Sequence, residues 1–551
     1  MTQLDSPIID VVNMIARTAC DDTEHRIWWS ARSGTLGTGD REHEGMCSLT
    51  LADLDRCAAR VAVHLDALGV RRGNRVGIIA RNRIEWVLLD LAVLKLGAVV
   101  AGIEPGRYEP AQVVREFGLT LLFTENATDS DTHDIGLVAT WAEDVDTDPT
   151  ALPAGHDHDP ADIFAIKQTS GSTGAPKGIE ATVASVNGSM SAVQQMFEHG
   201  PGDNLLVFLP VRYLQQRYWI YSALAHRHDI TLTDRFAVFD VARATAPTVI
   251  MGVPGFFDQL RHRLETAGVP ADNEGRRAAI QAELGGRIRY LWTGSAPAGR
   301  AMLDFFNDAG VPLYQGYGLN ETCIVSKNHP GAARVGSVGK VLPHKRIRFD
   351  ADGVLIVASD FPVNTRYTWS ARGASEQVYL PTGEVKTYDL GHVDEDGFLY
   401  IDGRVDDIVT LSGALNILVP TVEERLCELP EVHQCAVFGD GQPFLSAVVT
   451  PAGPDIDHEK LADAVTKLNA ELRYEQRVYA VVVACERFSM DNGLLGGQFK
   501  LKRNEIGRRY ADELALVYQE HDVYNDGTLA SAPVLVRDAA ARPHEEQIEV
   551  S

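Results

Sequence analysis

Short apolar runs and helical segments alternate along the first part of the chain. Residues 51–68 carry apolar side chains at helical spacing, and the run 75–80 that follows has the length and character of a buried strand. A second helical segment at 85–96 leads to a second short apolar run at 99–102. Such alternation is typical of βαβ units, in which helices cover both faces of a parallel sheet. We therefore expect an α/β fold.

The same rhythm returns later and then changes. Further apolar runs occur at 205–209, 248–251 and 289–292. After Gly339 the chain consists of short runs separated by turns, at 345–349, 353–357 and 397–401. A chain of 551 residues is too long for one hydrophobic core. We expect a large N-terminal domain, residues 1–403, that combines parallel-rich sheets and flanking helices with a β-rich subdomain.

A second, smaller unit is predicted beyond Gly403. Its expected strands and helices lie at 432–438, 445–449, 460–472 and 504–517. We expect these elements to form a small, mobile α+β domain over residues 404–525. Two polar stretches contain no predicted helix or strand. Residues 126–160 are expected to be a solvated excursion from the large domain, and residues 526–551 a poorly ordered tail.

The charge and the cysteines limit the classes of function. The net charge of −25 argues against general binding of nucleic acid or anionic membranes, so an anionic substrate needs local cations. No apolar run reaches the length of about 18 residues that a membrane span requires. The start of the chain lacks the basic and apolar pattern of a secretory signal. The 7 cysteines are scattered without a CxxC motif, which indicates reduced thiols in a cytoplasmic protein and neither disulfides nor a zinc site.

The segment 169–178 carries the strongest functional signal. It reads Thr-Ser-Gly-Ser-Thr-Gly-Ala-Pro-Lys-Gly and follows the apolar run 163–166. Glycines let backbone N–H groups approach an anion closely, and the hydroxyls and the lysine add donors. The segment is not a Walker P-loop, because Gly178 stands where Ser or Thr is required. A flexible surface linker is the alternative. The residues predicted to bind phosphate are Thr169, Ser170, Gly171, Ser172, Thr173, Gly174 and Lys177.

Residues 314–322, Tyr-Gln-Gly-Tyr-Gly-Leu-Asn-Glu-Thr, form a second cluster. Glu321 is a candidate ligand of Mg²⁺, a hard cation that prefers oxygen and shares its shell with substrate phosphates. Asn320 is suited to hydrogen bonding with a phosphate or acyl oxygen, and Tyr317 to stacking on a flat ring. The alternative is a purely structural turn, because Gly-Tyr-Gly is common in turns.

Two further clusters follow towards the C-terminus. Asp389 and Arg404 have the chemistry to bind a ribose diol or a phosphate, although a surface ion pair is the alternative. Residues 491–503, Asp-Asn-Gly-Leu-Leu-Gly-Gly-Gln-Phe-Lys-Leu-Lys-Arg, predict a mobile glycine-rich loop that presents Lys500. A solvated basic turn would have the same composition.

In their order and spacing, these four clusters resemble the motifs of the ANL superfamily of adenylate-forming enzymes. That family includes acyl- and aryl-CoA synthetases, adenylation domains of peptide synthetases and luciferases. The resemblance spans residues 49–509, and the segments 73–76, 97–100 and 499–503 are most similar to long-chain acyl-CoA synthetases. It implies a two-step reaction. A carboxylate attacks the α-phosphate of Mg·ATP to give an acyl-adenylate and pyrophosphate, and a thiol such as coenzyme A then takes the acyl group.

The resemblance also implies roles for individual residues. The loop from Thr169 to Lys177 would hold the β- and γ-phosphates, and Glu321 the Mg²⁺. Asp389 and Arg404 would bind the ribose, and Lys500 would be the catalytic lysine, acting beside Asn320 and Glu321. Asp406 matches the hinge between the two domains. The residues expected around the adenine are Gly294, Ser295, Ala296, Pro297, Tyr317 and Gly318.

Several positions depart from the family pattern. Asn320 stands where threonine is usual, Tyr388 replaces a glycine, and Gly496–Gln498 replace Thr-Pro-Thr before the lysine. Tyr213 and Val183 replace histidines. The changes near Tyr213, Gln215, Gln216 and Gly255 put a long aliphatic substrate in doubt. Aromatic residues, which include Tyr218, Trp219 and Phe257, hint at an aryl acid, with simple core filling as the alternative. The predicted substrate pocket contains Tyr213, Gln216 and Phe256.

Three functional hypotheses follow. The first is an ATP-dependent ligase of secondary metabolism that converts a small carboxylic acid into a thioester. The second keeps adenylation but changes the outcome to loading of an acyl carrier protein, amide formation, or activation of nitrite to diazotise an aromatic amine. The third is a nucleotide-binding relative without turnover.

Overall fold

The computed structural model describes most of the chain. The described residues are 8–30, 34, 36, 40–43, 45–106, 108–127, 132–148, 150, 157–170, 176–296, 298–453, 456–496, 501–520 and 533–539. Within them, no helix combines the length and the apolar character needed to cross a membrane.

The first sheet of the large domain contains six strands. Its order is β7-β6-β4-β5-β8-β9, and all neighbours are parallel except β8 and β9, which form an antiparallel hairpin. The strands are β4 (Arg75–Ile79), β5 (Val99–Ile103), β6 (Leu121–Thr124), β7 (His133–Asp134), β8 (Ile163–Ser170) and β9 (Pro176–Thr182).

The second sheet has ten strands, in the order β16-β15-β14-β13-β12-β10-β11-β1-β3-β2. Its centre, from β14 to β1, is parallel, and antiparallel strands close both ends. The strands are β1 (Arg26–Ser30), β2 (Asp40–His43), β3 (Met46–Thr50), β10 (Asn204–Val207), β11 (Asp229–Leu232), β12 (Val249–Gly252), β13 (Tyr290–Thr293), β14 (Leu313–Leu319), β15 (Cys323–Lys327) and β16 (Lys340–Val341).

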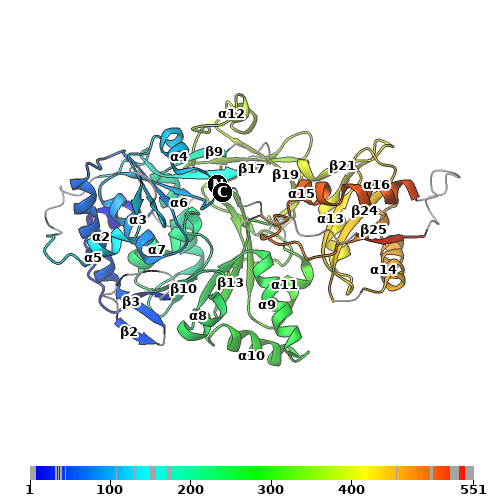
Figure 1. Cartoon of the computed structure of the whole chain (residues 1–551), viewed down its shortest axis with the longest axis horizontal. Helices are drawn as coiled ribbons and strands as arrows, with labels where there is room; N and C mark the ends of the chain where they lie inside the picture. Colours follow the sequence, from blue (N-terminus) through cyan, green and yellow to red (C-terminus); the bar gives the residue numbers. More distant parts are fainter. Residues whose placement is uncertain are drawn as a thin grey trace, which may run out of the picture.

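Helices cover these sheets and fill the space around them (Figure 1). The helix α2 begins at Thr50, whose side chain accepts a hydrogen bond from Asp53 N. The helix α3 is buried along its whole length, which explains its apolar residues all round. The helices are α1 (Val11–Arg17), α2 (Leu51–Ala67), α3 (Ile84–Lys95), α4 (Pro110–Phe117), α5 (Leu137–Glu143), α6 (Val183–Phe197), α7 (Leu214–His226), α8 (Val238–Thr245), α9 (Pro254–Thr266), α10 (Asn273–Glu283), α11 (Arg300–Asp308) and α12 (Ala374–Val378).

A third, antiparallel sheet follows, which confirms the predicted β-rich subdomain. Its order is β17-β18-β19-β20. Its strands are β17 (Lys345–Phe349), β18 (Val354–Ser359), β19 (Val385–Val393) and β20 (Leu399–Arg404).

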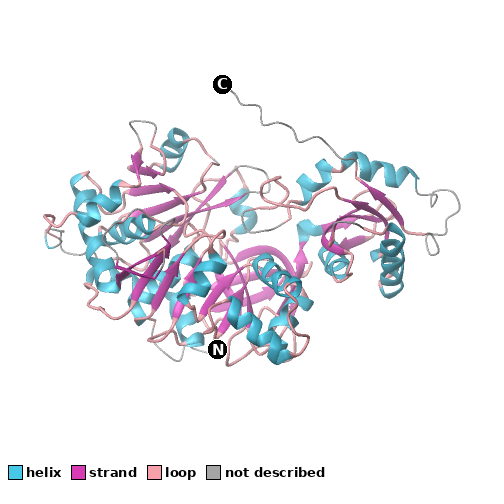
Figure 2. Ribbon diagram, turned by 60° about the horizontal axis from the view of Figure 1, so that its bottom comes forward, coloured by secondary structure: helices cyan, strands magenta, loops and turns pink. Residues whose placement is uncertain are grey.

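The C-terminal unit forms a separate lobe with its own sheet and helices (Figures 1 and 2). The 3₁₀ turn η3 (Val405–Asp407) leads into a two-stranded and then a four-stranded sheet, β23-β24-β25-β26. The elements are β21 (Ile408–Thr410), β22 (Asn416–Leu418), α13 (Val419–Cys427), β23 (Val432–Phe438), β24 (Leu445–Pro451), α14 (His458–Glu471), η4 (Tyr474–Gln476), β25 (Val478–Val483), α15 (Arg503–Arg509), α16 (Ala511–Glu520) and β26 (Leu535–Asp538).

Three expectations from the sequence were wrong in part. The single helix predicted at 504–517 is two helices, because the buried Tyr510 interrupts the helical dihedrals between α15 and α16. The stretch 126–160 contains the helix α5, with three residues buried. The supposed tail 526–551 contains β26, which pairs parallel with β25 and belongs to the small domain.

Candidate active site

The hairpin of β8 and β9 carries the predicted phosphate-binding segment. Thr169 lies opposite Lys177, and Ser170 opposite Pro176. The ammonium of Lys177 lies 5.0 Å from the ring centroid of Tyr367. The residues between the strands, Gly171, Ser172, Thr173 and Gly174, lie outside the described part of the chain. The structure thus describes the two arms of the predicted loop and the side chain of its lysine.

Asn320 and Glu321 occupy the tight turn between β14 and β15. A Cβ at Gly318 would lie 2.1 Å from Cys323 O, so only glycine fits beside this turn. The hydroxyl of Tyr367 donates to Glu321 Oε1 at 2.7 Å. A carboxylate has further lone pairs, so Glu321 keeps the capacity to bind a cation.

The donor set suits Mg²⁺ that arrives with a nucleotide. Among the described residues, no group of three or more His, Cys, Asp or Glu side chains could hold a metal ion. Mg²⁺ is usually bound by one or two carboxylates together with substrate phosphates. Glu321 beside the phosphate hairpin therefore fits such an ion.

Two buried lysines hold this turn, and the sequence interpretation missed both. Lys167 Nζ on β8 donates to Asn320 O at 2.9 Å, and Lys345 Nζ on β17 donates to Thr322 O at 2.9 Å. Burial would raise the pKa of the Cys323 thiol, but the ammonium groups of Lys167 and Lys345 lower it. Burial also lowers the pKa of Lys345 to about 8. A lysine within an apolar strand such as β8 was the only signal available in the sequence.

Asp389 links three strands at the predicted ribose site. It is 2% exposed and accepts hydrogen bonds from the Tyr317 hydroxyl and from Arg404 Nη1, the latter at 2.7 Å. The pKa of Tyr317 is raised well above its usual value, mainly by burial and secondly by the negative charge of the Asp389 carboxylate. Tyr317 therefore stays a donor, and the structure brings Tyr317, Asp389 and Arg404 together.

Tyr388 has a backbone conformation that side chains rarely adopt. Its φ is +61°, in the left-handed region where a bulky residue is strained. Its hydroxyl donates to Gln377 O at 3.1 Å, which holds the ring beside α12. The local backbone therefore keeps the conformation that the family glycine would favour.

The loop after β13 reaches the same region. A Cβ at Gly294 would lie 3.0 Å from Gly316 O on β14, and Ser295 has a φ of +70°. Ala296 follows in the same bend, and Pro297 lies outside the described residues. The close approach of two strand ends explains the glycine at 294.

The small domain is anchored next to the ribose residues. Asp406 lies in η3, two residues after Arg404, and its Oδ2 is 3.8 Å from Arg404 Nη2. Lys500 lies outside the described residues. The residues that flank its segment pair as a bridge between Leu495 and Leu501. Nearby, Met490 Sδ accepts a hydrogen bond from Arg235 of the large domain at 3.0 Å, so this part of the small domain faces the large one.

A cavity lies between α6, α7 and the face of the second sheet. Residues at helical spacing on α7 line it, from Gln215 and Tyr218 to Ser222 and His226, so they share one helix face. The complete lining is Met190, Val193, Gln194, His199, Gln215, Tyr218, Trp219, Ser222, His226, Trp292 and Ile324.

The predicted pocket residues lie elsewhere. Phe256 is buried in the core against Phe208, with ring centroids 4.5 Å apart. Gln216 is buried on the other side of α7, where its Nε2 contacts Met251 Sδ at 3.4 Å. The hydroxyl of Tyr213 accepts a hydrogen bond from Arg212 at the start of α7. None of these three residues lines the cavity, because α7 turns their neighbours Gln215, Tyr218 and Trp219 towards it. Their role in binding the substrate stays a prediction.

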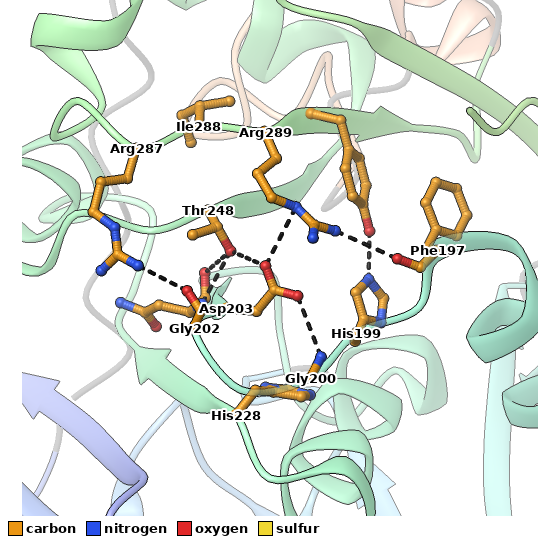
Figure 3. Close-up of polar contacts among 12 residues, drawn as sticks. Phe197, His199, Gly200, Gly202, Asp203, His228, Thr248, Arg287, Ile288 and Arg289 are labelled. Carbon is orange, nitrogen blue, oxygen red and sulfur yellow. Dashed lines mark hydrogen bonds and ion pairs between the residues drawn. The ribbon is translucent and has the colours of Figure 1, made fainter.

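His199, which lines the cavity, belongs to a cluster of polar contacts (Figure 3). The ring of His199 shares a hydrogen bond with the Tyr290 hydroxyl. Asp203 lies 3.4 Å from Arg289 Nε and accepts a hydrogen bond from the Thr248 hydroxyl at 2.8 Å. Burial lowers the pKa of His199 well below its usual value, so its imidazole is neutral at pH 7.

Comparison with known proteins gives matches to both parts of the chain. The sequence profile described as AMP-binding enzyme matches residues 37–355, and the profile described as AMP-binding enzyme C-terminal domain matches residues 406–522. A long-chain-fatty-acid–CoA ligase, FadD15 of Mycobacterium bovis, is 28% identical over 86% of this chain and 92% of its own. The 2-succinylbenzoate–CoA ligase of Bacillus subtilis is 26% identical over 71% of this chain and 80% of its own.

A solved structure shares the fold. The ATP-bound MatB of Rhodopseudomonas palustris has a TM-score of 0.73 and 21% identity, and the match covers 92% of this chain and 99% of that one. At this identity the likeness concerns the fold alone. It confirms the predicted α/β class with a separate C-terminal domain.

Proposed function

The chain belongs to the family of AMP-binding enzymes, and we propose that it uses ATP to activate a carboxylic acid and transfers the acyl group to coenzyme A. The family match confirms the resemblance to adenylate-forming enzymes. The two curated relatives are both ligases of a carboxylic acid and coenzyme A, which supports the same reaction type here.

One observation carries the proposal. The predicted nucleotide-binding residues form two groups of contacts, which the end of β14 and the turn after it connect. Arg404 binds Asp389, and Asp389 binds Tyr317 on β14. The turn after β14 carries Glu321, which binds Tyr367, and the ring of Tyr367 lies below Lys177. This order of contacts supports the proposal that the residues bind the ribose, the Mg²⁺ and the phosphates of one nucleotide.

The proposed chemistry follows from these groups. Asp389 would accept hydrogen bonds from the ribose hydroxyls, and Lys177 with the hairpin N–H groups would hold the phosphates. A carboxylate oxygen of the acid forms a bond to the α-phosphorus as the bond to pyrophosphate breaks. The thiolate of coenzyme A then attacks the acyl carbon and AMP leaves. Asn320 and Glu321 would orient the reacting oxygens and the cation.

Lys500 is the proposed catalytic lysine, and its removal tests the assignment. We expect Lys500→Ala to lower ATP–pyrophosphate exchange by about 10²–10³-fold, because a cation aimed at developing negative charge stabilises the transition state. Lys502→Ala is the matched control, since it removes a lysine two residues away. Equal rates in wild type and Lys500→Ala would contradict the assignment. If neither the wild type nor the variant shows exchange with any acid, the result would favour a nucleotide-binding relative without turnover.

The acceptor and the hinge are the finer parts of the proposal. The departures at Asn320 and Tyr388 leave carrier-protein loading, amide formation and nitrite activation as second candidates. Thioester formation should be compared with coenzyme A, a carrier protein, amines and nitrite side by side. We propose Asp406 as the hinge about which the small domain rotates between the two steps. Its position in η3, two residues after Arg404 and at the start of the small domain, supports this role.

A further inference from the structure

Lys327 has a buried ammonium group that contacts an aromatic ring but makes no hydrogen bond within the described part of the chain. The residue is 0% exposed, and its Nζ has no hydrogen-bond partner among the described residues. The side chain crosses β14 at Gly316, where a Cβ would lie 2.7 Å from Lys327 Cδ. Its Nζ ends 3.0 Å from the ring centroid of Trp292 on β13. The lysine therefore spans two strands and stops against an aromatic face.

That aromatic face belongs to the wall of the cavity. Lys327 pairs with Gly316 and Ile324 pairs with Gly318, with a bulge between the two pairs. Gly316 and Gly318 are two residues apart on β14, so their partners share one face of the sheet. Ile324 and Trp292 both line the cavity. Lys327 thus lies on the face that the cavity covers.

The cavity has a polar end next to this lysine. Phe197, whose ring centroid is 5.7 Å from Lys327 Nζ, also stacks on His199, which lines the cavity. His199 Nδ1 and Gln194 Oε1 are buried without a hydrogen-bond partner among the described residues. Polar atoms without a hydrogen-bond partner among the described residues therefore lie at this end of the cavity as well as on Lys327.

In the described part of the chain, no carboxylate acts on Lys327, and the carboxylate of the polar cluster has partners of its own. Asp203 is engaged by Arg289, by the Thr248 hydroxyl and by Gly200 N (Figure 3). A buried charge is costly unless it is paired, and burial accordingly lowers the pKa of Lys327 well below its usual value. An anionic group of a bound ligand would supply the missing partner.

We propose that Lys327 binds a second acidic group at the far end of the acid that the enzyme activates, so that the substrate is a dicarboxylic acid with an apolar or aromatic middle. This inference rests on the proposed function. Gly316, opposite Lys327, precedes Asn320 by four residues, which is roughly 13 Å along an extended strand. The two acidic groups are therefore on the order of 10 Å apart. Trp292, Trp219 and Ile324 line the stretch between them.

The test compares matched acids in ATP–pyrophosphate exchange. Octanedioic acid is compared with its monomethyl ester and with decanoic acid, and biphenyl-dicarboxylic acid with biphenyl-carboxylic acid. We expect the wild type to prefer the diacid of a pair by roughly 10- to 100-fold in kcat/KM, the size of a charge-assisted hydrogen bond. Lys327→Met should remove this preference, so that the ratio of kcat/KM for the diacid to kcat/KM for the monoacid falls towards one.

Two controls separate recognition from folding. Lys340→Met removes an exposed lysine on the neighbouring strand β16 and should keep the preference. Lys327→Met should fold and unfold at a temperature close to that of wild type, because the cost of burying the charge is removed together with its contact to the Trp292 ring. If it does not fold, Lys327→Gln and the diacid-to-monoester ratio of the wild type decide the question.

The possible failures are distinct. A wild type that prefers monoacids, or a diacid preference that survives Lys327→Met, would overturn the inference and leave the proposed function intact. Exchange with none of a wide panel of acids, mono or di, would overturn the proposed function and the inference with it.

Discussion

Asp90, Arg217 and Tyr221 form a buried polar triad between α3 and α7. Arg217 Nη1 donates to Asp90 Oδ1 at 2.9 Å, and the Tyr221 hydroxyl donates to Asp90 Oδ2 at 2.5 Å. The Arg217 side chain is 0% exposed and two of its nitrogens have no hydrogen-bond partner among the described residues. Because α7 lines the cavity, this triad fixes one of its walls.

Breaking the triad at one partner should be costly. We expect Asp90→Ala to lower the free energy of unfolding by about 3–5 kcal/mol, because it leaves a buried guanidinium unpaired. The double change Asp90→Leu with Arg217→Met should cost less than the single change, since both charges are then removed. Urea unfolding measures both. Arg346→Ala, which breaks an exposed pair with Asp360, is the control and should change stability by about 0–1 kcal/mol.

His228 predicts how stability depends on pH. Its imidazole is fully buried between the Ser222 hydroxyl and Asp229 O, and burial lowers its pKa to about 4. Below an unfolded pKa of about 6.5 the unfolded chain takes up a proton that the folded chain does not. The stability from this histidine is therefore complete above about pH 6.5 and falls as the pH drops towards 4, by on the order of 3 kcal/mol.

The histidine contribution is measured by unfolding at several pH values. His228→Gln should be less stable than wild type at pH 7.5, because hydrogen bonds are lost, but the difference should shrink at pH 5. His458→Gln, at an exposed position, should follow the wild-type curve. An equal difference in stability between His228→Gln and wild type at both pH values would contradict the lowered pKa of His228. His344 and His433, whose pKa values burial also lowers to about 4, contribute in the same direction.

At the level of elements, the strand β9 is hydrogen-bonded to a segment that connects β18 and β19 of the third sheet. Gly178 N donates to Trp369 O at 3.0 Å, and Thr368 N donates to Gly178 O at 2.9 Å. The Trp369 ring then stacks on Phe117 with centroids 4.5 Å apart. Tyr367, at the start of this segment, contacts both Lys177 and Glu321. The pairing therefore connects the phosphate hairpin to the predicted cation ligand.

Gly178→Ala should disturb this connection. A Cβ at position 178 would lie 2.2 Å from Trp369 Cε2, so the indole and its backbone must move. We expect a loss of about 1–3 kcal/mol in the free energy of unfolding, as for other overpacked sites, and a raised KM for ATP. Gly413→Ala is the control, because no atom lies within 4 Å of its added Cβ. An unchanged KM together with full stability would contradict the proposed link.

At the level of the whole molecule, the sheet of the small domain includes the strand β26, which begins well after the end of the preceding helix α16. β26 pairs parallel with β25, from Ala480 opposite Leu535 to Val483 opposite Asp538. Val534 and Ala539 at its ends are buried. The sheet of the small domain is therefore completed by residues well beyond its last helix.

Removal of this strand should weaken the small domain. We expect a chain that ends at residue 532 to show faster proteolysis of the small domain, because β25 becomes an unpaired edge and apolar side chains are exposed. A chain that ends at residue 540 keeps β26 and should match the full chain. Limited proteolysis with identification of the first cleavage site distinguishes the two. First cleavage within the large domain in both truncations would contradict the role given to β26.

Much of the fold and the nucleotide residues could be predicted because their signals are local. The apolar pattern of α2 and α3 and the short apolar runs of β4 and β5 depend only on residues close together in the sequence. They can therefore be recognised without knowing where each segment lies in the fold. The clusters around Glu321 and Asp389 were likewise recognisable as short motifs. The strand β26 was missed, because its apolar run, 534–536, is only three residues long and has no periodic pattern around it.

Contacts between distant segments could be found only in three dimensions. Lys167 holds Asn320 from 153 residues away, and Arg217 meets Asp90 across 127 residues. The cavity takes its lining from two helices and two strands, and its α7 residues are the neighbours of those predicted. No periodicity encodes such pairs, since they depend on how completed elements pack against one another. Local chemistry therefore identified the reaction type, whereas packing decided which side chains face the cavity.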